Sequence, residues 1–212
     1  MARYKLTLAY DGTAFFGSQR QARRRTVQAE VEKAARKLGW HGTGIVMAGR
    51  TDAGVHAAGQ VASLDLLWRH DAERLRDALN ANLPEDLIVV AAEMASDSFH
   101  PRFDARSRRY RYDVRFAPHR HPLEDKWCWR TWPAIGLERL NQVAGSIAGR
   151  HDFGAFGSAP RKGGSTERTV TTSKWTIENH MVHYEIEGDG FLYRLVRRLV
   201  FVQVAVCQGK CS

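Results

Sequence analysis

The sequence has few cysteines and no long hydrophobic run. Three cysteines in 212 residues cannot all pair within one chain, which excludes a disulfide-stapled framework. Cys207 and Cys211 lie one helical turn apart if a helix continues there, but without a pair of histidines nearby they favour free thiols over a zinc site. No segment approaches the roughly 20 apolar residues that span a bilayer. The N-terminus enters an alternating strand without a secretory signal, so we expect a cytoplasmic protein with no membrane partner.

Acidic residues are also scarce relative to basic ones. The chain has 23 Asp and Glu against 32 Lys and Arg, a formal net charge of +9. An excess of this size favours a polyanionic partner, because each neutralised phosphate releases counterions, although charge alone leaves a basic non-binding surface open. Arginines cluster at residues 20–25 and 102–115. Neither cluster lies on a strongly amphipathic surface helix, which favours nucleic acid over a membrane surface.

The first half of the chain alternates between strand and helix patterns. Period-two alternation and short apolar runs predict strands at residues 3–10, 45–47, 60–66 and 87–92, and helical spacing predicts helices at 26–38 and 71–81. Thr26 is the expected N-cap of the first helix. The order β-α-β-β-α-β is that of the split βαβ unit of the ferredoxin-like fold.

The same pattern then begins again. Strands are predicted at residues 109–116, 169–177 and 181–187, and helices at 137–148 and from about Phe191 onward. A complete second unit needs one more strand, but the chain stops at Ser212, so we expect the last strand of the second half to be missing. The sequence therefore predicts an α+β protein of two ferredoxin-like halves with antiparallel sheets, residues 1–104 and an apparently truncated 105–212.

A loop at Ala48–Ala57, between two predicted strands, concentrates chemically active groups. It holds the Asp52 carboxylate, Arg50, His56, a threonine hydroxyl and two glycines. Glycine permits backbone geometry closed to other residues, so such a loop can aim one side chain outward. On residue types alone, a tight turn capped by Asp52 with Arg50 as a solvated ion-pair partner is the simpler interpretation.

Two residues in the second half are further candidates. Strand alternation places Tyr110 on the face opposite Arg109 and Arg111, where it points into a cleft or packs in a core. Arg197 follows two apolar residues on a strongly apolar helix, where a charge needs a buried partner. A buried carboxylate such as Asp52 would serve, whereas a solvated position is the common fate of an arginine.

These residues fall within a set of motifs that resembles one family in content and order, the tRNA pseudouridine synthase A family. The Gly-Arg-Thr-Asp-Ala-Gly-Val-His run within Ala48–Ala57 is highly specific, and the matching motifs cover nearly all of the chain. They are Tyr10–Thr13, Gln19–Gln21, Ala48–Ala57, Asn80–Pro84, Phe99–Phe103, Arg109–Tyr112, Phe153, Gly190–Tyr193 and Val196–Arg198.

The resemblance implies isomerisation of uridine to pseudouridine in the anticodon stem-loop of tRNA, at nucleotide positions 38 to 40, without a cofactor or a metal. It implies Asp52 as nucleophile, Tyr110 as the residue that stacks on the base and a candidate for proton transfer, and Arg197 as the ion-pair partner of Asp52. Because Tyr110 and Arg197 belong to the second half, we expect a catalytic cleft between the halves. The uridine must leave its helical stack to react, at a cost of a few kcal/mol.

The resemblance also implies partners. Arg50 matches a residue that helps to hold the flipped-out RNA, and a homodimer is implied in which one tRNA touches both subunits. With the arginine clusters, the expected RNA-binding set is Arg20, Gln21, Arg23, Arg24, Arg25, Arg50, His56, Arg109 and Arg111.

The sequence departs from the family pattern in two places. Ser18 stands where the family has a tryptophan or another large residue, and residues 201–212 do not resemble the family's continuation. Two other functions therefore remain open: a truncated family member that binds tRNA without catalysis, and a metal-dependent phosphodiesterase that uses Asp52, His56 and other histidines.

Overall fold

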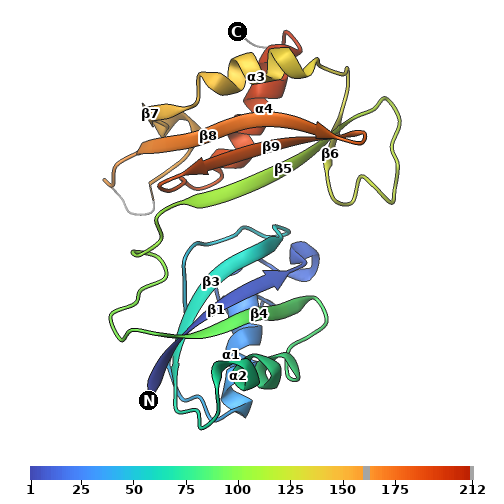
Figure 1. Cartoon of the computed structure of the whole chain (residues 1–212). Helices are drawn as coiled ribbons and strands as arrows, with labels where there is room; N and C mark the ends of the chain where they lie inside the picture. The colour runs from blue at the N-terminus through green and yellow to red at the C-terminus, as the bar shows by residue number, and fades with distance from the viewer. Residues whose placement is uncertain (160–162, 211–212) are drawn as a thin grey trace. The chain divides into compact units, whose positions relative to one another are not determined.

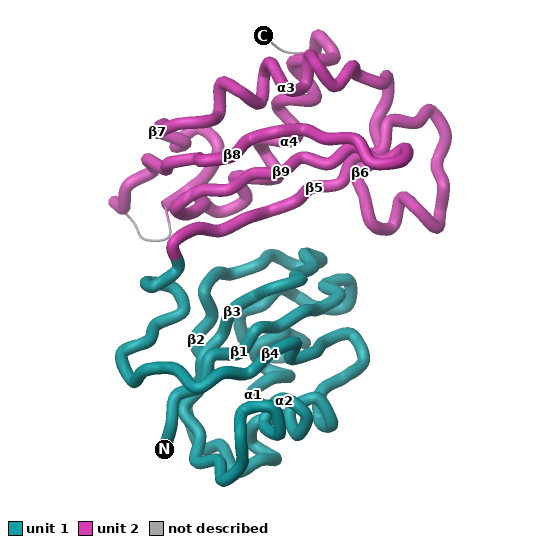
Figure 2. The backbone as a smooth tube through the Cα atoms, in the orientation of Figure 1, with its two compact units in different colours: residues 1–105 teal, residues 106–212 magenta. Residues whose placement is uncertain are grey.

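The computed structural model describes residues 1–159 and 163–210 and divides the chain into two compact units, Met1–Ala105 and Arg106–Ser212 (Figure 2). Over these described residues, each unit contains one β-sheet and two α-helices, so the predicted α+β class is confirmed. None of the helices in this part of the chain has the length and apolar character of a bilayer span. Cys211 lies outside the described residues, so the predicted pair of thiols cannot be followed; Cys207 is buried.

Unit 1 is a four-stranded sheet with two helices packed on it (Figure 1). Its strands lie in the order β2-β3-β1-β4, and every neighbouring pair is antiparallel. The elements are β1 (Ala2–Tyr10), α1 (Val27–Lys37), β2 (Val46–Met47), β3 (Ala57–Leu66), α2 (Ala72–Asn80) and β4 (Leu87–Ala95), with a short 3-10 helix, η1 (Gly12–Ala14), after β1. Alternate residues of β1, from Tyr4 to Tyr10, are buried against the helices as its pattern predicts. Thr26 caps α1 by accepting a hydrogen bond from Ala29 N.

Unit 2 is a five-stranded sheet in the order β6-β5-β9-β8-β7, with helices α3 and α4 (Figure 1). The β5–β6 pair is parallel and the other three pairs are antiparallel. The elements are β5 (Arg108–Phe116), β6 (Trp129–Thr131), α3 (Leu137–Gly145), β7 (Gly149–Asp152), β8 (Glu167–Glu178), β9 (Met181–Gly188) and α4 (Leu195–Cys207), with the 3-10 helix η2 (Gly154–Phe156) after β7. Tyr184, Ile186 and Trp175 form the centre of its core together with the apolar face of α4.

The structure corrects the sequence-based boundaries in unit 2. Strands β6 and β7 were not predicted, because three and four residues are too short to show an alternation and all of β7 is exposed. The last helix begins at Leu195, so Phe191 and Leu192 precede it rather than belong to it. Arg194 has a left-handed backbone with φ of 60°, which interrupts the helical geometry just before Leu195.

Candidate active site

The loop that carries Asp52 leaves the sheet of unit 1 between β2 and β3, as predicted. Its first residues are fixed to β3: Ala48 N donates to Val61 O at 2.8 Å, and the Gln60 side chain donates to Gly49 O at 2.8 Å. Arg50 is exposed. The loop is therefore tied to the sheet as far as Gly49, three residues before Asp52.

Thr51, the residue directly before Asp52, has all its polar groups engaged. Its N–H donates to the Ser18 hydroxyl at 2.8 Å, and its carbonyl accepts from Ser18 N at 3.0 Å. Its own hydroxyl lies 2.9 Å from the hydroxyl of Tyr10, a buried residue of β1 whose pKa is raised by burial. The backbone leading into Asp52 is thus fixed from two directions.

The residues after Asp52 are also anchored. Asp52 O accepts from Val55 N at 3.2 Å, which closes a turn, and Gly54 N donates to Phe15 O at 3.3 Å. Gly54 has φ of +78°, a conformation that favours glycine. Gly12 approaches this turn so closely that a Cβ on it would lie 2.1 Å from Val55 O. The short distance explains the glycine in the Tyr-Asp-Gly-Thr motif.

His56 lies at the end of the loop, beside the segment that follows β1. Its Nδ1 atom accepts a hydrogen bond from Gly12 N at 3.1 Å and lies 3.1 Å from Asp11 Oδ1. These contacts give His56 a structural function in holding the loop. No group of three or more His, Cys, Asp or Glu within residues 1–159 and 163–210 is arranged to hold a metal ion.

The Asp52 side chain itself is half-buried. Within unit 1, all of whose residues the structure describes, its carboxylate accepts no hydrogen bond and forms no ion pair. The loop therefore holds the backbone of Asp52 on both sides, while neither carboxylate oxygen has a partner within unit 1.

Tyr110 and Arg197 both belong to unit 2. Tyr110 is a half-buried residue of β5, and its ring meets that of Phe191 edge to face, with centroids 5.2 Å apart. Arg197 lies in the first turn of α4, and its side chain is exposed between the buried residues Leu195 and Leu199. No carboxylate among the described residues of unit 2 pairs with Arg197.

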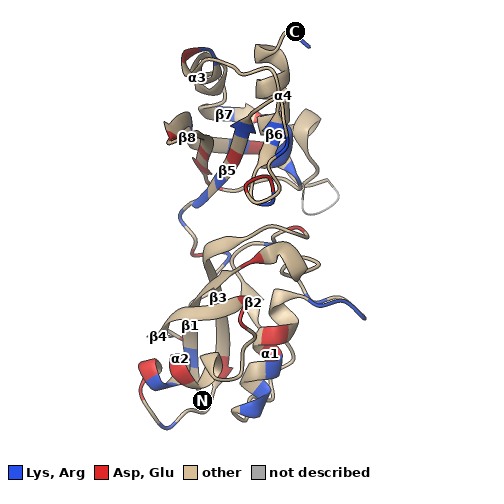
Figure 3. Ribbon diagram, turned by 90° about the vertical axis from the view of Figure 1, so that its right-hand side faces the viewer, with Lys and Arg blue, Asp and Glu red and all other residues tan. Residues whose placement is uncertain are grey.

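Basic residues gather on the loop that precedes α1 (Figure 3), but two of its arginines are committed to ion pairs. Arg20 donates to Glu32 at 2.7 Å, and Glu32 is fully buried. Arg25 makes two hydrogen bonds of 2.7 Å to Asp86 and lies over the Phe15 ring. Removing Arg25 would leave Asp86 without its cation, and removing Arg20 would leave the buried Glu32 with only the longer contact of 3.7 Å to Arg36, so both arginines have a structural function.

The tip of the same loop is different. Arg23 and Arg24 are exposed, and neither pairs with a carboxylate of unit 1. The Arg24 guanidinium lies 4.4 Å from the centroid of the Phe16 ring, which is 48% exposed. The Gln21 side chain donates to Phe16 O at 2.7 Å and fixes this turn. An exposed aromatic ring beside one arginine, with a second exposed arginine next to it in the sequence, is a suitable surface for RNA.

The two β5 arginines each have an acidic partner. Arg109 lies 2.9 Å from Glu185 and its hydrogen bond lowers the pKa of that carboxyl. Arg111 donates to Asp113 at 2.8 Å, and Asp113 also contacts the buried His183 at 2.8 Å. Burial opposes ionisation of Asp113, but the hydrogen bonds from Arg111 and His183 outweigh it and lower its pKa. These cations are therefore largely neutralised.

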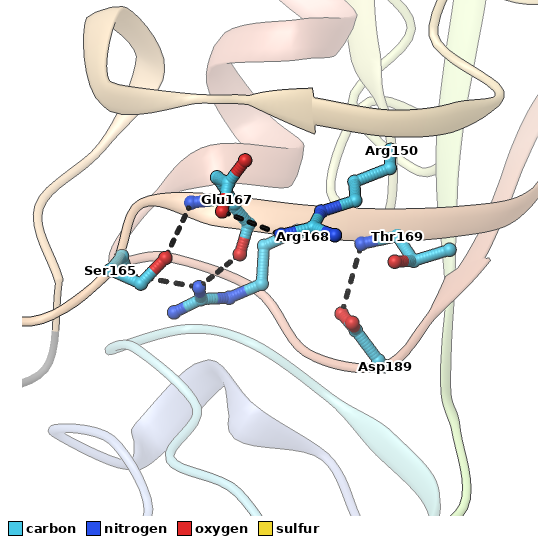
Figure 4. A pocket seen from close by; sticks show the side chains of 6 residues that line it. All are labelled: Arg150, Ser165, Glu167, Arg168, Thr169 and Asp189. Atoms are coloured by element: carbon cyan, nitrogen blue, oxygen red, sulfur yellow. Dashed lines mark hydrogen bonds and ion pairs between the residues drawn. The ribbon is translucent and has the colours of Figure 1, made fainter.

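A polar hollow of about 210 Å³ in unit 2 was not predicted from the sequence (Figure 4). Arg150 pairs with Glu167 at 2.8 Å, and Thr169 N donates to Asp189 at 3.2 Å. Arg168 donates to Ser165 O at 2.9 Å. The lining carries two guanidinium groups and two carboxylates, so its charges balance. Four of the six lining residues lie within Ser165–Thr169, but Arg150 and Asp189 come from distant positions, so no single sequence motif marks the hollow.

The chain belongs to the tRNA pseudouridine synthase family, whose model matches residues 7–104 and 143–212. It is 37% identical to the tRNA pseudouridine synthase A of Geobacillus sp. (strain WCH70) over 211 residues, which cover 99% of this chain and 85% of that protein. It is 36% identical to the enzyme of the same name from Streptococcus equi subsp. equi (strain 4047) over 213 residues, with 99% and 86% covered. The predicted family is thus confirmed.

Proposed function

We propose that this protein isomerises uridine to pseudouridine in the anticodon stem-loop of tRNA, at nucleotide positions 38 to 40, with Asp52 as the nucleophile. Family membership and the identity to enzymes named tRNA pseudouridine synthase A support the reaction. The observation that supports Asp52 as nucleophile is that hydrogen bonds hold the backbone on both sides of it, while its carboxylate has no partner within unit 1.

The reaction rearranges bonds without net change in composition. The bond from uracil N1 to ribose C1′ breaks, the base turns while it is held, and a bond forms from C5 to C1′; the C5 proton leaves and N1 gains a proton. A carboxyl group acts as a nucleophile in its ionised form. Attack at C1′, attack at C6 and assistance to a glycal route all require this ionised state.

Tyr110 and Arg197 complete the proposed catalytic set. Tyr110 stacks on the extruded base and is the candidate for proton transfer, and Phe191 supports its ring from the side. We assign Arg197 as the ion-pair partner of Asp52 during the reaction, because its exposed guanidinium has no carboxylate partner among the described residues of unit 2. The proposal requires these three residues to act on one uridine.

RNA binding is divided among residues with different surroundings. We assign direct phosphate or base contacts to Arg23, Arg24 and Arg50, which are exposed. The remaining members of the proposed set form ion pairs or hydrogen bonds within the protein and so shape the surface. The arginines among them also contact a phosphate in addition to their carboxylate. They are Arg20, Gln21, Arg25, His56, Arg109 and Arg111.

The proposed architecture is two ferredoxin-like halves, residues 1–104 and 105–212, in a homodimer in which one tRNA contacts both subunits. The antiparallel order β4-β1-β3-β2 in unit 1 supports the first half. In unit 2 the neighbouring strands β5-β9-β8 match the neighbours β1-β3-β2 of unit 1, in which the first strand along the chain pairs with the third and the third pairs with the second. Light scattering that gave a monomer with and without tRNA would contradict the dimer.

The test is pseudouridine mapping on an unmodified tRNA transcript incubated with purified protein. We expect product at positions 38 to 40, none with Asp52→Asn, and tRNA affinity within a few-fold for that variant. Binding without product from the unaltered protein would favour the non-catalytic tRNA-binding function. Activity that a chelator abolishes, and that added metal restores, would instead favour metal-dependent chemistry.

A further inference from the structure

Ser18 is fully buried in the segment between η1 and α1, although its small polar side chain stands where the family pattern has a large one. Its hydroxyl accepts the Thr51 N–H at 2.8 Å, and its own N–H donates to Thr51 O at 3.0 Å. The two residues therefore form a closed pair of hydrogen bonds across 33 positions of sequence. We call this pair the Ser18–Thr51 clamp.

The clamp is attached to a rigid element. Ser18 O accepts from Gln28 N at 2.9 Å, and Gly17 O accepts from Val27 N at 3.4 Å, so both residues are fixed to the first turn of α1. Gly17 has φ of +88°, and a Cβ on it would lie 2.7 Å from Thr51 O. The close approach of the two backbones is what lets a side chain as short as serine reach the Thr51 amide.

We infer that Ser18 is a positioning residue for Asp52, an inference that rests on the proposed role of Asp52 as nucleophile. The Thr51 amide and carbonyl define the peptide planes on both sides of Thr51, and the second of these leads directly into Asp52. Fixing that plane restricts the positions that the Asp52 Cα atom and side chain can take. Because a displacement of about 1 Å at a reacting group costs about 100-fold in rate, a single buried hydroxyl can have a large catalytic effect.

The first test measures the clamp without any activity. Amide hydrogen exchange followed by NMR should show a protected Thr51 N–H in the unaltered protein. In Ser18→Ala, which removes one atom and fits the same space, we expect Thr51 exchange at least about 10-fold faster, with the β1 and β4 amides unchanged. Unchanged Thr51 exchange in Ser18→Ala would overturn the inference.

The second test separates positioning from general stability. Steady-state kinetics on the tRNA transcript should show kcat lowered about 10- to 100-fold in Ser18→Ala and KM changed less than about twofold. Ser18→Thr, which keeps the hydroxyl, should recover much of the kcat. The matched control is Ser63→Ala, which removes the same atom from a buried site on β3 and should retain the unaltered kcat.

The outcomes distinguish this inference from the proposed function. Full kcat in Ser18→Ala, or equal losses in Ser18→Ala and Ser63→Ala, would overturn a positioning role. Full activity in Asp52→Asn would overturn the proposed nucleophile instead, and the exchange of the Thr51 amide would still decide whether Ser18 holds the loop.

Discussion

Arg25 and Asp86, 61 positions apart in the sequence, form two parallel hydrogen bonds of 2.7 Å. The pair joins the arginine-rich loop to the segment just before β4, and the Phe15 ring lies beneath the guanidinium. An arginine that composition assigns to RNA binding thus holds together two parts of unit 1.

We predict that Asp86→Asn destabilises the protein in a pH-dependent manner. The hydrogen bonds from Arg25 lower the pKa of Asp86, so the pair stabilises the fold above the unfolded carboxyl pKa of about 3.9 and ceases to do so as pH falls through the folded value. Urea denaturation at pH 7 should show a loss of about 1 kcal/mol, and the difference from the unaltered protein should shrink below about pH 4. A loss that stayed constant to pH 2 would contradict this account.

Arg24→Ala should act on RNA rather than on stability. Its guanidinium contacts the exposed Phe16 ring and no carboxylate of unit 1. We expect weaker tRNA binding, and a slope of log affinity against log salt that is smaller by about 0.7 to 0.9. Fluorescence anisotropy over a salt series measures both. The control is Arg76→Ala on α2, whose guanidinium pairs with Asp77, and equal effects of the two variants would refute a specific contact.

Tyr110→Phe should separate stacking from proton transfer. The ring and its edge-to-face contact with Phe191 remain, so tRNA affinity should hold within a few-fold. Loss of a general acid or base lowers rates by about 100- to 10,000-fold, and we expect kcat to fall by at least the smaller factor. Tyr112→Phe, two residues further along β5, is the matched control and should remain active. Full activity of Tyr110→Phe would leave its hydroxyl without a catalytic role.

Gly12→Ala should disturb the Asp52 loop from outside it. The added Cβ would lie 2.1 Å from Val55 O, so either η1 or the turn after Asp52 must move. We expect a loss of about 1 to 3 kcal/mol in unfolding free energy and a larger fall in kcat than in tRNA affinity. Gly59→Ala meets nothing within 4 Å and should be nearly neutral. Thermal melts and single-turnover assays on both variants provide the comparison.

Local patterns predicted much of the fold. The alternation in β1 and the Thr26 cap of α1 depend on neighbouring residues, and both are confirmed. The short edge strands β6 and β7 were missed because they are defined by hydrogen bonds to β5 and β8, and three or four residues carry no pattern that predicts such pairing. The start of α4 was misplaced because only the backbone of Arg194 shows the interruption.

The candidate residues could be chosen from the sequence, but the sequence did not show which of them form ion pairs within the fold and which remain exposed. Sequence placed Asp52 in a loop between two strands, as the structure has it. It could not separate Arg25 from Arg24, because the difference lies in Asp86, far along the chain. Likewise, the sequence shows Ser18 only as a departure from the family pattern, because Thr51, its hydrogen-bond partner, lies 33 positions away and is brought close only by folding.

Both backbone polar groups of Thr51 are hydrogen-bonded, and this limits how far the loop can change shape when a substrate binds. A loop whose shape is set when the protein folds has little freedom left to lose when tRNA arrives. If Asp52 is the nucleophile, as we propose, adjustment during each catalytic cycle falls on the nucleic acid, whose uridine must rotate out of its stack to reach the carboxylate. In that case unit 1 acts as a rigid surface, and the conformational change on binding occurs in the RNA.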